Sequence, residues 1–205
     1  IESAWELHAG QIYKTTLTED IWQVFVDGEM LNLCRWPNVE GYIEDEQPMA
    51  MDPLPLSLWD QHGTWGHSAD NSTNGLMIDD GVKGLGSSGL DMSGAIAILN
   101  VGSFKTSAAP VSSHTPGEDQ FTYDPSYTDP YLTWQKPNHA YYYLEGKLNL
   151  LDVPGEWFFD KATKELFVYT KDGSDPSLAD VKGKTQAYAM AFNACDYLEI
   201  RDINF

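Results

Sequence analysis

The chain has 205 residues, of which 42% are apolar and 13% aromatic, and this composition excludes global disorder because it suffices for a packed core. Its 12 basic and 31 acidic residues give a formal net charge of −19. That balance argues against nucleic acid or an anionic membrane as a partner, since both require a basic protein surface.

The sequence contains no apolar run long enough to span a bilayer and no recognisable signal peptide. The chain begins without Met, as a mature secreted product or a chain trimmed at both ends does. An acidic surface suits an extracellular or salt-tolerant protein, and it also serves solubility alone. We therefore expect a secreted or cell-surface location.

The first predicted element is a β-hairpin over residues 21–34. Residues 21–26 (IWQVFV) and 29–34 (EMLNLC) are rich in β-branched, aromatic and other apolar side chains. Asp27 and Gly28 lie between them, and this pair favours a two-residue turn in which both positions need a positive φ. The sequence therefore predicts two antiparallel strands joined by a tight turn.

Residues 39–93 are the longest stretch without a regular hydrophobic pattern, and we expect a long irregular loop that either packs on the surface or carries function. Within its segment HGTWGH, the side chains of His62, Trp65 and His67 can bind a sugar through ring stacking and polar contacts. The two histidines can also ligate a metal, but no third ligand follows at a recognisable spacing. An ordered loop with an exposed aromatic ring is the structural alternative.

Three shorter strands are predicted at residues 94–101, 120–123 and 140–144, separated by turns that contain Pro or Gly. Tyr131, Trp134 and the three tyrosines at 141–143 make the neighbouring sequence rich in aromatic rings. Such rings suit the faces of sugars, and Trp134 is the binding candidate among them. Aromatic rings are also frequent in cores and cross-strand pairs of β proteins, so that alternative stays open.

A second hairpin is predicted over residues 155–170, where GEWFFD and ELFVYT flank a four-residue turn. A glycosidase needs two facing carboxyl groups about 5–10 Å apart. Glu156 and Asp160 lie four positions apart on one strand, a separation of about 13 Å, which is too far. We therefore predict structural roles, with Glu156 bonded to a turn and Trp157 in the core.

The last predicted elements are two short strands in residues 187–192 and 197–205, joined by a turn at Asn193 and Ala194. This pattern is typical of one coil of a stacked β-structure, and one coil cannot bury its own apolar face. Cys195 and the distant Cys34 both sit in apolar contexts, which favours two buried free thiols, with one long-range disulfide as the alternative.

Four passages of the chain resemble the N-terminal portion of secreted bacterial proteins with a right-handed parallel β-helix, many of which come from marine polysaccharide degraders. The passages are residues 23–38, 94–123, 141–170 and 187–205. In that family a strand pair ending in Arg-(Trp/Tyr)-Pro-Asn, here Arg35 to Asn38, precedes a barrel- or sandwich-like module. A hairpin that opens with Gly-Glu-Trp, here from Gly155, then leads into the coils of the helix.

The resemblance implies an all-β chain in three parts: N-terminal strands and a hairpin at 1–38, a barrel- or sandwich-like module at 39–185, and a truncated β-helix start at 186–205. It also implies a parent glycoside hydrolase or polysaccharide lyase whose catalytic groups lie on later coils. This chain would then be an accessory, substrate-flanking module, with a polysaccharide or oligosaccharide and the remainder of the β-helix as partners. The alternatives are a non-catalytic carbohydrate-binding module and a structural or adhesive surface module.

The sequence predicts no cofactor. Acidic residues at 44–46, 79–80, 119 and 124 offer oxygen ligands for a structural calcium ion, but none follows the spacing of an EF-hand loop.

Overall fold

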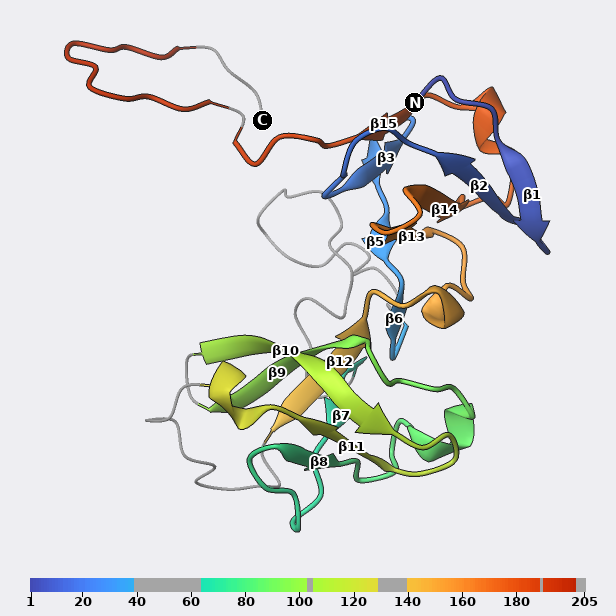
Figure 1. The fold of residues 1–205 in the computed structure, drawn as a ribbon, viewed down its shortest axis with the longest axis vertical. Coiled ribbons are helices and arrows are strands. Elements are labelled where there is room, and N and C mark those ends of the chain that lie inside the picture. The colour runs from blue at the N-terminus through green and yellow to red at the C-terminus, as the bar shows by residue number, and fades with distance from the viewer. Residues whose placement is uncertain (39–63, 103–104, 129–139, 189, 202–205) are drawn as a thin grey trace, which may run out of the picture.

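The computed structural model describes residues 1–38, 64–102, 105–128, 140–188 and 190–201. The elements described there are β-strands joined by short 3-10 helices, and the strands form three sheets (Figure 1). The prediction of an all-β chain is therefore confirmed. Strand order leaves each of the three sheets open, so the described strands form no closed barrel.

The largest sheet has seven antiparallel strands in the order β6-β12-β9-β10-β11-β8, with β7 also paired to β12. Its strands are β6 (Arg35–Trp36), β7 (Gly66–His67), β8 (Leu76–Ile78), β9 (Ile96–Gly102), β10 (Lys105–His114), β11 (Gln120–Tyr123) and β12 (Tyr141–Glu145). The predicted strands at 94–101, 120–123 and 140–144 are confirmed as β9, β11 and β12.

The second sheet has five strands in the order β1-β2-β14-β13-β5. They are β1 (Glu6–Ala9), β2 (Ile12–Thr16), β5 (Asn32–Leu33), β13 (Glu156–Asp160) and β14 (Glu165–Tyr169). The predicted second hairpin is confirmed as β13 and β14, while β5 joins β13 in a parallel pair. Strands from both ends of the chain thus share one sheet.

The third sheet has three strands, β3 (Val24–Val26), β4 (Glu29–Met30) and β15 (Val181–Gly183), in the order β15-β3-β4. Asp27 and Gly28 have φ values of 51° and 82°, so the predicted Asp-Gly turn is confirmed. The second predicted strand of this hairpin is divided, because β5 leaves β4 to pair in the five-stranded sheet and β6 continues into the seven-stranded sheet.

Short 3-10 helices lie in the connections: η1 (Gly86–Ser88), η2 (Pro125–Tyr127), η4 (Leu148–Leu150) and η5 (Pro176–Leu178). In η2 and η5 an aspartate carboxylate accepts a hydrogen bond from the backbone N–H two positions on, and a proline follows it as the first residue of the helix. These are the local signals that begin a helix, and proline also limits how far it extends. None of the helices among the described residues is long and apolar enough to cross a membrane.

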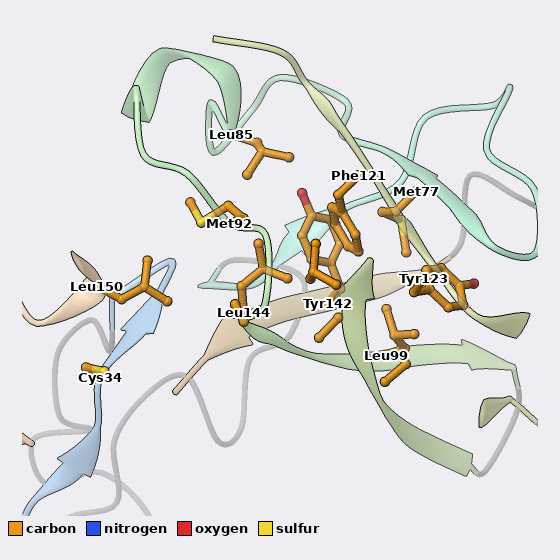
Figure 2. Packing of buried hydrophobic residues seen from close by; sticks show 14 of the residues in the cluster. Cys34, Met77, Leu85, Met92, Leu99, Phe121, Tyr123, Tyr142, Leu144 and Leu150 are labelled. Carbon is orange, nitrogen blue, oxygen red and sulfur yellow. The ribbon is translucent and has the colours of Figure 1, made fainter. Parts of the chain in front are cut away.

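Two apolar clusters hold the sheets together. The larger lies under the seven-stranded sheet, where Tyr142, Phe121 and Met77 are fully buried (Figure 2). The smaller lies between the five- and three-stranded sheets, which pack face to face. Successive residues of β14 point to opposite sides, so Phe167 belongs to the larger cluster and Val168 to the smaller.

The segment after β15 differs from the prediction for it. Its described residues, 184–188 and 190–201, contain no strand and are exposed throughout, and in Figure 1 they leave the sheets as an extended arm. The predicted strands at 187–192 and 197–205 are therefore absent from this part of the chain, because nothing described packs on their apolar side chains. The boundaries between the three predicted parts of the chain, after residues 38 and 185, stay a prediction.

The two cysteines are both free. Cys34 is buried, as predicted, and its thiol donates to the backbone oxygen of Lys147 at 3.2 Å. Burial raises the pKa of this thiol to about 12, which makes it unreactive. Cys195 is exposed on the arm, so the prediction of a second buried thiol is wrong.

Candidate functional site

The central strand of the candidate site is β12, whose side chains alternate between two faces. Tyr142 and Leu144 point into the larger core, while Tyr141, Tyr143 and Glu145 are half-buried on the opposite face. The edge of β12 that is not paired with β9 is covered by β6 and β7, which place their own side chains beside those of β12. We call this the Tyr143 face: Arg35, Trp65, His67, Tyr141, Tyr143 and Glu145.

An aromatic and cationic stack occupies the middle of the Tyr143 face. The guanidinium carbon of Arg35 lies 3.7 Å from the centre of the Tyr143 ring and 6.0 Å from that of Trp65. Trp65 meets Tyr143 edge to face, with ring centres 4.7 Å apart and planes at 83°. A cation placed over an aromatic face in this way is attracted by the negative charge density of the ring.

Arg35 is buried and its polar atoms are only partly satisfied. Its Nε donates to the backbone oxygen of Pro37 at 3.0 Å, and its backbone N–H donates to Oε1 of Glu156 at 3.2 Å. The Nη2 atom of Arg35 and Oε2 of Glu156 are buried without a hydrogen-bond partner. Burial raises the pKa of Glu156 to about 8, so this carboxyl is mostly protonated at neutral pH.

Burial also alters the other acids near the stack. It raises the pKa of Glu145, although the nearby positive charge of Arg35 opposes this. The pKa of the Tyr143 hydroxyl is raised by burial first and by Glu145 second, again against the effect of Arg35. The stack is therefore a poorly hydrated place, where burial favours the neutral forms of the nearby acids and the charge of Arg35 opposes this at Glu145 and Tyr143.

His67 closes one end of the Tyr143 face. It lies opposite Tyr141 in the strand register, and the two rings are 4.7 Å apart between centres. Its Nδ1 is 2.8 Å from Oδ2 of Asp80, and both side chains are about a quarter exposed. This end is the more open part of the face, and it presents a ring and a polar pair together.

A buried acid lies on the other side of the same strand. The Tyr142 hydroxyl donates to Oδ2 of Asp79 at 2.5 Å, and Asp79 accepts from the backbone N–H of Gly81 through Oδ1. Burial raises the pKa of Asp79, while the Tyr142 bond lowers it in part. The ring of Tyr142 also lies directly on Gly66, where an added Cβ would come within 2.7 Å of it. Gly66 of the HGTWGH segment is thus needed for packing.

The structure brings together two of the four residues that the sequence singled out for sugar binding. Trp65 and His67 both lie on the Tyr143 face, but Trp65 is only 8% exposed and is held against Tyr143 and Arg35. The alternative of an exposed ring at this position is therefore wrong. His62 and Trp134 lie outside the described residues.

The sequence did not identify Arg35 or Asp80 as partners of these rings. The sequence signal that separates Tyr141 and Tyr143 from Tyr142 is the alternation of side chains along a strand. The run of three tyrosines therefore contributes to both faces of the sheet, and the three rings do not share one environment. No comparable pattern pointed to Arg35, which reaches the face through pairing of β6 with β12.

The predicted burial of Trp157 is confirmed, since it lies in the smaller core. Glu156 is buried too: its Oε1 accepts from the backbone N–H of Arg35 at the start of β6, and hydrogen bonds from the backbone of Asp152 and Val153, in the bend before β13, lower its pKa in part. Asp160 instead stabilises the β13–β14 turn, where its Oδ1 accepts from the backbone N–H of Ala162 at 2.8 Å. The carboxyl groups of Glu156 and Asp160 thus make separate local hydrogen bonds.

No group of three or more His, Cys, Asp or Glu side chains converges as a metal site in the part of the chain that the structure describes. The acids considered for calcium are bound locally: Asp80 accepts from Val82 N–H, Asp119 from Gly86 N–H and Asp124 from Ser126 N–H. Residues 44–46 lie outside the described residues.

Comparisons with known proteins place this geometry in context. A family model described as a GH141 insertion domain matches residues 90–171, about two fifths of the chain, from just before β9 to just after β14. No curated protein matches the chain.

A solved structure titled "Glycoside hydrolase" is similar in fold, with a TM-score of 0.54 and 16% sequence identity. The match covers 87% of this chain, which spans 29% of the length of that structure. At this identity the likeness shows the fold alone.

Proposed function

We propose that this chain is an accessory part of a larger carbohydrate-active protein, a glycoside hydrolase that acts on a polysaccharide or oligosaccharide outside the cell. The observation that carries the proposal is the GH141 insertion-domain match, since residues 90–171 include β12 and four of the seven strands of its sheet, β9 to β12. The fold likeness to a longer glycoside hydrolase supports it.

The described residues favour an accessory role over catalysis in this chain. The two carboxyl groups that the sequence offered as a pair, Glu156 and Asp160, serve the β6 junction and a turn respectively. Asp79 is buried and accepts a hydrogen bond from Tyr142, and Glu145 is half-buried beside the positive charge of Arg35. In the proposal the catalytic carboxylates lie in another part of the protein, on the coils of a parallel β-helix.

Sugar contact in this proposal occurs at the His67 end of the Tyr143 face. His67 and Tyr141 are half-buried there and offer a ring face together with the polar pair to Asp80. Trp65 serves as a support for Tyr143 and Arg35, and His62 and Trp134 remain candidate contacts.

The test is hydrolysis of a panel of polysaccharides by the longer protein, with release of reducing ends as the readout. We expect activity on at least one neutral or acidic glycan, and a loss of activity toward long chains, but not toward short ones, when Tyr141→Ala is introduced. Tyr127→Ala is the matched control, because Tyr127 is an exposed ring on η2. Inactivity on every glycan, with binding retained, would instead favour the non-catalytic binding module.

A further inference from the structure

A second aromatic side chain combined with a cation lies far from the Tyr143 face, at the corner where the β13–β14 turn meets the start of β3. Trp22 is 53% exposed there, although tryptophan usually buries most of its surface. The ammonium of Lys161 lies 5.0 Å from the centre of its ring. We call Trp22, Lys161, Lys164 and Asp20 the Trp22 corner.

The Trp22 ring is fixed although it is exposed. Its indole N–H donates to the backbone oxygen of Thr185 at 3.2 Å, and its backbone N–H donates to the oxygen of Lys184 at 2.8 Å. These two bonds tie the residue to the chain segment that follows β15. A ring held in this way loses little conformational freedom on binding a ligand, so it is suited to act as a platform.

The cation is also held in place. Lys161 begins the four-residue β13–β14 turn, which the Asp160 carboxylate stabilises through Ala162 N–H. At the end of the same turn, the ammonium of Lys164 is paired with Asp20 at 2.5 Å, and its backbone oxygen accepts from Leu17 N–H at 2.8 Å. The turn is therefore anchored on the segment that leads to Trp22.

Lys161 differs from half of the lysines of this chain in its partners. Five lysines each pair with a carboxylate: Lys14 with Glu165, Lys147 with Asp91, Lys164 with Asp20, Lys171 with Glu29 and Lys182 with Asp180. Lys161 makes no ion pair with any residue that the structure describes, although the chain carries 31 acidic residues. Asp20, which is paired with Lys164, acts on Lys161 only at longer range, where the charge of Lys161 helps to lower the pKa of Asp20. The ammonium therefore has room for a direct contact with an acid group of a ligand.

We propose that the Trp22 corner binds a saccharide residue that carries an acid group. The apolar C–H face of the sugar ring would stack on the indole, and its carboxylate or sulfate would pair with the Lys161 ammonium. The choice of a saccharide rests on the proposed function. The requirement for an acid group rests on Lys161 itself, because a neutral sugar leaves that charge unpaired.

The experiment titrates the intact protein at low salt with a galacturonate tetramer, a sulfated galactose tetramer and a neutral galactose tetramer. We expect at least one acidic tetramer to bind more tightly than the neutral one. The tetramer that does so shows whether the acid group is a carboxylate or a sulfate. Trp22→Ala should weaken that binding about tenfold, the effect of losing one stacked ring. Tyr127→Ala, which removes an equally exposed ring elsewhere, should leave it unchanged.

The variant Lys161→Gln tests the contribution of the cation separately from that of the Trp22 ring. This variant should lose the preference for the acidic over the neutral tetramer while binding to the neutral tetramer stays as it was. Lys182→Gln is the matched control, since Lys182 is exposed and already paired with Asp180. The indole N–H resonance of Trp22 in an NMR spectrum should shift during the titration, which locates the ligand.

Three results would overturn the inference: no binding of either acidic tetramer, tighter binding of the neutral one, or equal affinities in Trp22→Ala and Tyr127→Ala. If saccharides bind but Trp22→Ala has no effect, the proposed function stands and the Trp22 corner is wrong. If the longer protein neither hydrolyses nor binds any glycan, the proposed function fails independently of this corner.

Discussion

The Tyr143 face and the Trp22 corner use the same interaction, a cation over an aromatic ring, under opposite conditions. At the Tyr143 face, Arg35 is buried, lies 3.7 Å from the ring centre and is surrounded by acids whose pKa values burial raises. At the Trp22 corner, Lys161 lies 5.0 Å from an exposed ring. From this comparison we expect such a pair to contribute to stability where it is buried and to stay accessible to ligands where it is exposed.

The largest expected effect is a pH dependence of stability that arises beside the buried pair. Because burial raises the pKa of Glu156 from 4.5 to about 8, its contribution to stability is fully present below pH 4.5 and is lost as the pH rises through about 8. The shift corresponds to at most about 5 kcal/mol. Urea unfolding at a series of pH values between 4 and 9 measures the loss.

Glu156→Gln is the control for this pH dependence, since the amide keeps an acceptor for the Arg35 backbone N–H without a titrating proton. Its stability should vary much less across this range. Some slope remains, because burial raises the pKa values of Glu145 and Asp79 in the same direction. Equal slopes in the two proteins would mean that Glu156 is not the group responsible.

The second effect compares the two cations directly. Arg35→Ala should lower the free energy of unfolding by about 3 kcal/mol, because it removes buried packing, the stack on Tyr143 and the bond to Pro37. Lys161→Ala should change it by less than about 0.5 kcal/mol. Urea titrations of both variants test the comparison, and similar losses would show that burial does not separate the two pairs.

A smaller loss is expected from the opposite side of β12. Tyr142→Phe removes the hydroxyl that donates to Asp79 and leaves a buried acceptor with one partner fewer. The expected cost is about 2 kcal/mol. Thermal unfolding measures it, with Tyr127→Phe as a surface control, and a cost as small as that of the control would show that Asp79 finds another donor.

The smallest effect on stability is expected at the Trp22 corner. Trp22→Ala should alter the free energy of unfolding by less than about 0.5 kcal/mol, because the ring is exposed and its truncation removes the indole bond to Thr185 and the exposed contact with Lys161. Urea unfolding of Trp22→Ala, measured together with the binding titration, distinguishes a loss of binding from a loss of stability. A loss as large as that of Arg35→Ala would mean that the ring is part of the core.

Local sequence signals predicted strands and turns well. The Asp27-Gly28 turn, the β13–β14 hairpin and the strands β9, β11 and β12 depend on patterns within a few residues. The division of residues 29–36 among three sheets does not, because it depends on partners more than 100 residues away, such as Glu156 and Leu144. Local periodicity contains no information about such partners.

The candidate site was predictable in part for the same reason. The HGTWGH segment pointed to Trp65 and His67, and both lie beside β12. Their burial could not be read from the sequence, since it follows from how β6 and β7 share one edge of that strand. The predicted strands of the C-terminal segment did not form among the described residues, because alternation alone provides no surface on which to pack.

The parallel pairing of β5 with β13 has a consequence for how the protein is made. The chain leaves the five-stranded sheet at β5 and returns to it at β13, so the residues between form a closed excursion whose two ends touch. Closing so long a loop costs entropy before any contact repays it, which slows folding. During synthesis, β1, β2 and β5 emerge first, but their sheet can be completed only after β13 and β14 have left the ribosome.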